Sequence, residues 1–122
     1  MSALRQFLAV YLGSPDSANM ALWHALAPEE QARRRQEGEA AWHAWVRRNE
    51  AAIVVMGGPL GPTRRISAEG MDDARNAMTA FTIVQAETHE AAAALFENHP
   101  HFTLFPGEAI EVMPILPVPG AR

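Results

Sequence analysis

Residues 79–100 read TAFTIVQAETHEAAAALFENHP, and they predict a strand that passes directly into a helix. The strand occupies residues 79–86. Thr88 suits the N-cap of the helix, and Glu90 lies in its first turn near the positive end of the helix dipole. The helix runs through an alanine-rich segment and must end before Pro100, because a residue that precedes proline disfavours the helical conformation. The stretch therefore predicts the strand and the helix of one β-α-β unit.

An earlier segment of the chain repeats this order. Residues 4–12 predict a first strand that is buried on both faces, because its alternation of apolar and polar residues is weak. The pattern then turns helical from residue 17 to about residue 49, where a short piece around residues 19–26 precedes a longer helix that begins at about Pro28, a favoured first helical position. This long helix has one buried apolar stripe, formed by Ala41, Trp42, Trp45 and Val46. The β-prone run 51–56 follows it and completes the unit.

The remaining segments complete the predicted sheet. Residues 57–62 (GGPLGP) predict a tight bend, 63–67 a short returning strand, and 68–76 a polar loop. Residues 109–115 predict the last strand. Two successive β-α-β units predict an α+β, ferredoxin-like fold, in which an antiparallel sheet carries both helices on one face.

Length and composition indicate one ordinary globular domain. The chain has 122 residues, of which 48% are hydrophobic and 20% are charged. We expect residues 1–116 to form the domain and the proline-rich residues 117–122 to form an extended tail. No apolar run approaches the roughly 20 residues of a membrane helix, and the N-terminus does not resemble a signal peptide. These features predict a cytoplasmic protein with no membrane contact.

The chain contains neither cysteine nor lysine, and this excludes several reaction classes. All ten basic residues are arginine, against fourteen acidic residues, which gives a net charge of −4. Without lysine there is no Schiff-base amine and no P-loop lysine, and without cysteine there is no thiolate nucleophile or disulfide. The acidic second half of the chain argues against a nucleic-acid partner. The run Arg33-Arg34-Arg35 lies between glutamates, and we expect it to form a solvated helix face.

The predicted sheet leaves one face uncovered. Ile110 and Val112 alternate with Ala109, Glu111 and Met113 in the last strand, so one of these two sets must face away from the helices. An uncovered face that bears methionine and alanine is an association surface. We therefore predict a homodimer that closes sheet on sheet.

Several segments of the chain occur in an order that is similar to a known family. They are residues 7–11 (FLAVY), 42–45 (WHAW), 57–61 (GGPLG), 81–86 (FTIVQA), 99–100 (HP) and 110–115 (IEVMPI). Together they resemble the YCII-related (DGPF) family of small dimeric α+β barrel proteins. The resemblance implies a ferredoxin-like protomer and a dimer with a cavity between its two sheets. It also implies a family whose biochemistry is mostly unassigned, with a few members that act on chlorinated aromatic compounds.

His43 is one candidate catalytic residue. Some YCII-like proteins are thought to use a histidine of the first long helix together with an aspartate just before the Gly-Pro turn. Here the helix offers His43, but Met56 stands before Gly57 in place of the aspartate. His43 is therefore either a histidine on the flank of the helix or a general base at the mouth of the cavity.

Glu111 is the other candidate catalytic residue. Period-2 geometry places it on the inter-sheet side if its two neighbours face the helices. A carboxylate there needs a partner, since an unpaired buried charge is costly. The possible partners in strands are Arg5, Arg64 and Arg65. Glu111 is thus an interface ion-pair residue, a water-exposed residue at the rim, or a cavity acid or base that acts with Tyr11.

Six residues are candidate ligand contacts. Trp42 and Trp45 are either core residues or stack on an aromatic ligand, and Arg64 would hold an anionic or phenolic molecule. His99 follows the second helix, where the helix dipole favours a cation. The His-Pro-His segment 99–101 lacks a third ligand at a defined spacing, so we predict no metal site. The complete set is Tyr11, Trp42, Trp45, Met56, Arg64 and His99.

Two functions are compatible with these residues. The first is a homodimer of unassigned biochemical role that binds a small organic ligand between its sheets. The second is a cofactor-independent lyase, isomerase or dehydrochlorinase-like enzyme with His43 as general base. An interaction module is a remote third option. We predict no cofactor in either of the first two.

Overall fold

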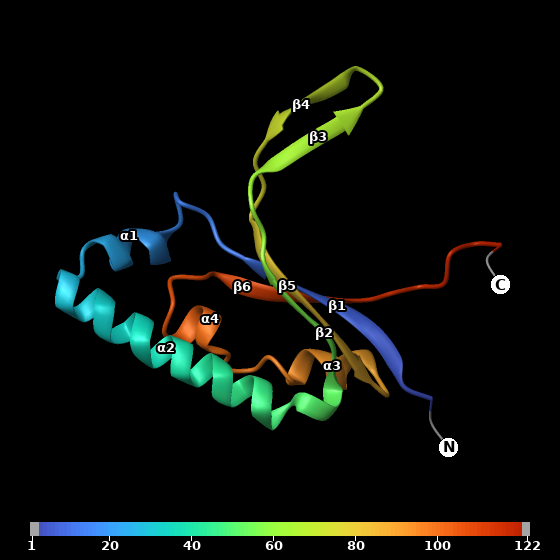
Figure 1. Cartoon of the computed structure of the whole chain (residues 1–122), viewed down its shortest axis with the longest axis horizontal. Helices are drawn as coiled ribbons and strands as arrows, with labels where there is room; N and C mark the ends of the chain where they lie inside the picture. The colour runs from blue at the N-terminus through green and yellow to red at the C-terminus, as the bar shows by residue number, and fades with distance from the viewer. Residues whose placement is uncertain (1–2, 121–122) are drawn as a thin grey trace.

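The computed structural model describes residues 3–120, and Figure 1 shows its course. Its elements in chain order are β1 (Arg5–Leu12), α1 (Ala18–His24), α2 (Pro28–Arg48), η1 (Glu50–Ala52), β2 (Ile53–Pro59), β3 (Thr63–Ser67), β4 (Gly70–Ala74), β5 (Met78–Ala86), α3 (His89–Ala94), α4 (Pro100–Thr103) and β6 (Ala109–Pro114). No helix of residues 3–120 is both long and apolar enough to cross a membrane.

The main sheet has four strands in the order β2-β5-β1-β6, and every neighbouring pair is antiparallel. β1 lies inside the sheet, where it pairs with β5 from Arg5 to Leu12 and with β6 from Phe7 to Leu12. The predicted α+β class with an antiparallel sheet is confirmed. The strand order is consistent with the ferredoxin-like arrangement that two β-α-β units produce.

One face of the main sheet carries the hydrophobic core. Phe7, Ala9 and Tyr11 alternate along β1, point to the helical side and are fully buried. Trp45 of α2 and Phe96 after α3 complete the cluster. Within residues 3–120 no helix lies over the other face (Figure 1), which is formed by the alternate side chains Leu8, Val10, Leu12, Phe81, Ile83, Ala109, Glu111 and Met113. We call this surface the open sheet face.

A second sheet consists of β3 and β4 alone, and here the predicted polar loop 68–76 is wrong. Residues 70–74 (GMDDA) lack the usual strand formers, but they pair with β3 from Ala74 to Gly70. Asp72 and Asp73 lie opposite Arg65 and Arg64, and such pairs of opposite charge stabilise an antiparallel ribbon. Gly70 allows the turn through its φ of 115°. Figure 1 shows this hairpin rising away from the main sheet on the side opposite α2.

Strand β2 extends to Pro59, beyond the predicted end at residue 56. It is an edge strand with an irregular register, and edge strands tolerate glycine and proline. Gly57 has a φ of 70°, and a Cβ there would lie 2.0 Å from the carbonyl oxygen of Phe81. The glycine thus lets β2 approach β5 closely. The bend begins after Pro59.

The predicted tail has neither helix nor strand from residue 117 to residue 120. Leu116 and Val118 are exposed. Ala121 and Arg122 at the tail end lie outside the described residues, as do Met1 and Ser2 at the other terminus. The single domain 1–116 stays a prediction.

Candidate functional site

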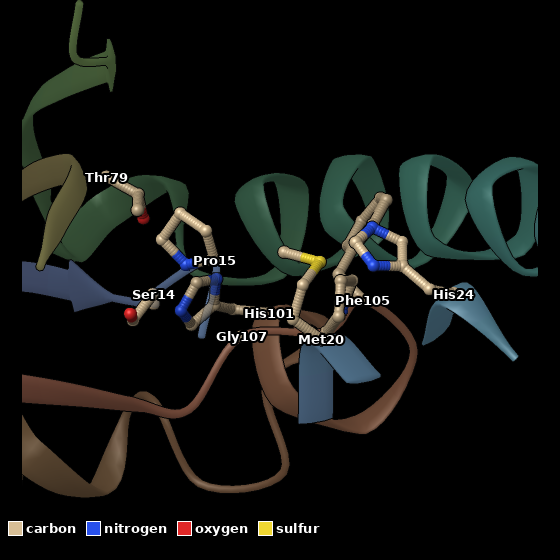
Figure 2. Close-up of a pocket in the computed structure, with 10 residues that line it drawn as sticks. Ser14, Pro15, Met20, His24, Thr79, His101, Phe105 and Gly107 are labelled. Carbon is tan, nitrogen blue, oxygen red and sulfur yellow. The ribbon is translucent and has the colours of Figure 1, made fainter. Parts of the chain in front are cut away.

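A pocket of about 380 Å³ lies at the end of the main sheet, where β1 ends and β5 and β6 begin. Its lining residues are Gly13, Ser14, Pro15, Met20, His24, Thr79, His101, Phe105, Pro106 and Gly107. We call it the end-of-sheet pocket. Figure 2 shows Met20 in the middle, with Ser14, Pro15 and His101 to one side of it and Phe105 and His24 to the other. The volume is in the range of small-molecule sites.

His101 forms part of the pocket wall in a tightly defined position. It is the second residue of α4, and its Nε2 donates a hydrogen bond of 2.8 Å to the carbonyl oxygen of Leu12. Gly107 packs directly on the ring, because a Cβ at this glycine would lie 2.3 Å from Nε2. Burial lowers the pKa of His101, so the imidazole is neutral at neutral pH. His101 therefore contributes shape and a neutral ring to the pocket, and no charge.

The two hydroxyl groups of the pocket are already engaged. Thr79 Oγ1 donates to the carbonyl oxygen of Tyr11 over 2.9 Å. Ser14 Oγ accepts from the backbone N–H of Asp16 over 3.2 Å. None of the ten lining residues carries a permanent charge. The imidazole of His24 is exposed and is therefore accessible to a bound molecule.

His99 lies behind this wall and is fully buried. Its Nδ1 accepts a hydrogen bond of 3.0 Å from the backbone N–H of His101, while its Nε2 has no hydrogen-bond partner among the described residues. The ring centroid lies 4.6 Å from that of Trp42, 4.8 Å from that of Trp45 and 5.3 Å from that of Tyr11. Burial, and the nearby His101 to a lesser degree, lower the pKa of His99 to about 3. His99 is thus a neutral core histidine whose N–H faces aromatic rings.

Tyr11 is also a core residue. Its hydroxyl lies 3.0 Å from Thr82 Oγ1, and Thr82 in turn donates to the carbonyl oxygen of Met56 over 3.0 Å. Tyr11 is therefore the donor to Thr82. Its ring stacks on Trp42 with a centroid distance of 5.2 Å. Burial raises the pKa of Tyr11 to about 12, so the phenol keeps its proton at neutral pH.

The structure brings four of the predicted site residues together, but it does so in the core. Tyr11, Trp42, Trp45 and His99 contact one another, and Trp45 Nε1 also donates to the carbonyl oxygen of Leu95. None of the four lines the end-of-sheet pocket.

The other four predicted residues are dispersed over the surface. His43 is exposed on α2, and Met56 is exposed on the edge strand β2. Glu111 is exposed on the open sheet face. Arg64 lies on the hairpin, where its Nε is 3.4 Å from Asp73 Oδ1. A single chain therefore does not unite His43 and Glu111 at one site.

A second, larger cavity of about 1130 Å³ adjoins the end-of-sheet pocket and shares Ser14 and Pro15 with it. It lies between the base of the hairpin and the loop after β1. Its charged lining residues are Asp16, Arg64, Asp73 and Arg75. The described residues contain no group of three or more histidines and carboxylates arranged to hold a metal ion.

Sequence reasoning did not select the residues of the end-of-sheet pocket. His24 is not among the candidate residues, and His101 enters only through the His-Pro-His segment 99–101. One feature of the sequence could have indicated this pocket, namely the pair Pro106-Gly107 shortly after His101. This glycine is the residue that packs on the imidazole.

No protein-family model matches the chain, and no curated protein matches it. Among solved structures, it is similar to 5-chloro-2-hydroxyhydroquinone dehydrochlorinase (TftG) of Burkholderia phenoliruptrix in complex with 2,5-dihydroxybenzoquinone. The two are 24% identical with a TM-score of 0.47, and the match covers 88% of this chain and 89% of that chain. This similarity is too low to establish a family or a function. The resemblance to the YCII-related family stays a prediction.

Proposed function

We propose that this protein binds a small, uncharged, mostly apolar molecule in the end-of-sheet pocket. The observation that carries the proposal is the lining itself, which combines a small-molecule volume with apolar walls and no permanent charge. A charged ligand would lose hydration in this pocket and gain no ionic partner. An uncharged ring would contact Phe105 and the thioether of Met20, and both favour aromatic partners.

We also propose that the protein acts as a homodimer that closes over the open sheet face. That face is apolar across three strands, and Met113 on β6 is 39% exposed. The cavity between two sheets, expected from the sequence, would form between the two open faces. The end-of-sheet pocket lies at the end of this same sheet, and none of the residues named for the open sheet face lines it.

A pocket-filling variant tests the binding proposal. We expect Met20→Trp to weaken the binding of small phenols at least tenfold, because the larger side chain occupies the pocket. Ala21→Trp places the same side chain on an exposed neighbouring position of α1 and should leave the dissociation constant unchanged. Isothermal titration with a series of neutral phenols measures both. Equal binding by the two variants would place the ligand elsewhere.

A second candidate function is cofactor-independent proton transfer in the same pocket. It is favoured by the presence of two imidazoles, His24 and His101, in one apolar pocket. In this reading His24 replaces His43, which is exposed on α2. Turnover of phenolic or chlorinated substrates should be lost in His24→Ala and kept in His43→Ala. Turnover that is kept in His24→Ala and lost in His43→Ala would identify His43 as the general base. If the unmodified protein does not turn over any of these substrates, ligand binding remains the proposed function.

A further inference from the structure

We propose that the β3–β4 hairpin of each protomer lies across the open sheet face of a second copy and places Arg64 beside the partner's Glu111. The inference rests on the proposed homodimer, and it adds which element crosses the interface and which ion pair it forms. It follows from four observations on the hairpin and on the sheet.

First, the hairpin is an unsupported arm. β3 and β4 pair only with each other, and they rise away from the main sheet in Figure 1. Ile66 and Met71, which lie opposite each other near its tip, are 75% and 63% exposed. A two-stranded ribbon alone in water is marginally stable, so large apolar side chains at its tip indicate a surface that covers them.

Second, the two faces of the hairpin differ in chemistry. Alternation along the strands puts Arg64 and Ile66 on one face together with Asp73 and Met71. The opposite face carries the pair Arg65 and Asp72 and otherwise only small residues. The first face therefore has an apolar tip, with the ion pair of Arg64 and Asp73 behind it.

Third, the open sheet face has the complementary pattern. Val10 lies at its centre, with Phe81 opposite it on β5 and Glu111 opposite it on β6. In the next row Leu8 lies between Ile83 and Met113. Glu111 is therefore the one carboxylate among the apolar side chains of these two rows.

Fourth, Glu111 needs a cation once this face is covered. Within the described part of the chain it forms no ion pair. Arg5 is engaged on the helical side, where its guanidinium lies 5.4 Å from the centre of the Phe7 ring. Arg65 lies on the polar face of the hairpin. Of the three arginines that lie in strands, Arg64 remains, and it lies on the face that carries the apolar tip.

The contact of Arg64 with Asp73 is compatible with this role. Arg64 approaches Asp73 through its Nε, and the side chain is 71% exposed. Its remaining N–H groups can donate to a second carboxylate. In the dimer Arg64 would lie between its own Asp73 and the partner's Glu111, and it would separate these two like charges.

The absence of cysteine in the native chain allows a direct test. Two single variants, Arg64→Cys and Glu111→Cys, are purified separately, mixed, and treated with a short bismaleimide. Any link between them must join two chains. We expect a covalent dimer whose linked peptides contain positions 64 and 111. A mixture of Arg64→Cys with Glu37→Cys, which is exposed on α2, is the matched control and should stay unlinked.

Charge exchange gives an independent measurement. Arg64→Glu and Glu111→Arg should each raise the dimer dissociation constant at least tenfold, and the double variant should return it close to the original value. Circular dichroism controls for folding. A dimeric wild-type protein without the 64–111 link and without this rescue would overturn the hairpin contact and leave the homodimer intact. A monomeric wild-type protein would overturn both.

Discussion

At the residue scale, His99 couples the stability of the fold to pH. Its pKa is lowered from 6.5 to about 3 in the folded chain, chiefly by burial among Trp42, Trp45 and Tyr11. Between these two values the unfolded chain binds a proton that the folded chain does not bind. The free energy of unfolding should therefore be highest above pH 6.5 and fall steadily as the pH drops towards 3.

Denaturant titrations at several pH values measure this dependence. His99→Phe should flatten the slope between pH 6.5 and pH 3 without removing it, because burial also lowers the pKa of His101. His43→Ala, at an exposed position, should keep the full slope. An unchanged slope in His99→Phe would show that His99 is not the group that binds the proton on unfolding.

Gly107 determines the position of the pocket histidine. A Cβ at this residue would lie 2.3 Å from His101 Nε2 and 2.5 Å from the carbonyl oxygen of His101. Gly107→Ala should therefore lower the free energy of unfolding by about 1–3 kcal/mol and weaken ligand binding in the end-of-sheet pocket. Gly61→Ala is the control, since a Cβ there meets no atom within 4 Å. Chemical denaturation followed by tryptophan fluorescence separates the two variants.

At the element scale, the sequence predicted those elements whose signals are local. Thr88 is the N-cap of α3, and its side chain accepts a hydrogen bond from the N–H of Ala91. The last predicted strand, 109–115, is β6. The arginine run on α2 is solvated, with Arg33 bonded to Glu30 and Glu37. Each of these features depends on residues at most a few positions apart.

The elements that the sequence missed depend on pairing at longer range. Strand β4 has no β-prone residues of its own, and it exists because its aspartates lie opposite arginines of β3. Helix α4 has a proline at its first position, where proline is favoured, but the whole helix has only four residues. The end-of-sheet pocket combines segments around residues 13–15, 20–24, 79 and 101–107. The pocket can be located only once the order of the strands in the sheet is known, and no local pattern in the sequence gives that order.

At the scale of the whole molecule, the open sheet face determines the oligomeric state that we expect. If the homodimer forms, the folded state is stabilised by association, and the melting temperature should rise with protein concentration. Met113→Arg places a charge on the β6 side of this face and should raise the dimer dissociation constant at least tenfold. Leu22→Arg makes a similar change on α1, at a side chain that is 68% exposed and away from the sheet, and it should leave association unchanged.

Light scattering and analytical ultracentrifugation across micromolar concentrations measure these dissociation constants. The comparison of the two variants matters more than either alone, because both add a positive charge to a chain with a net charge of −4. A general effect of charge would therefore change the dimer dissociation constants of both variants equally. An effect confined to Met113→Arg would locate the interface on the open sheet face. A wild-type protein that stays monomeric throughout would leave this face without a partner and would contradict the homodimer.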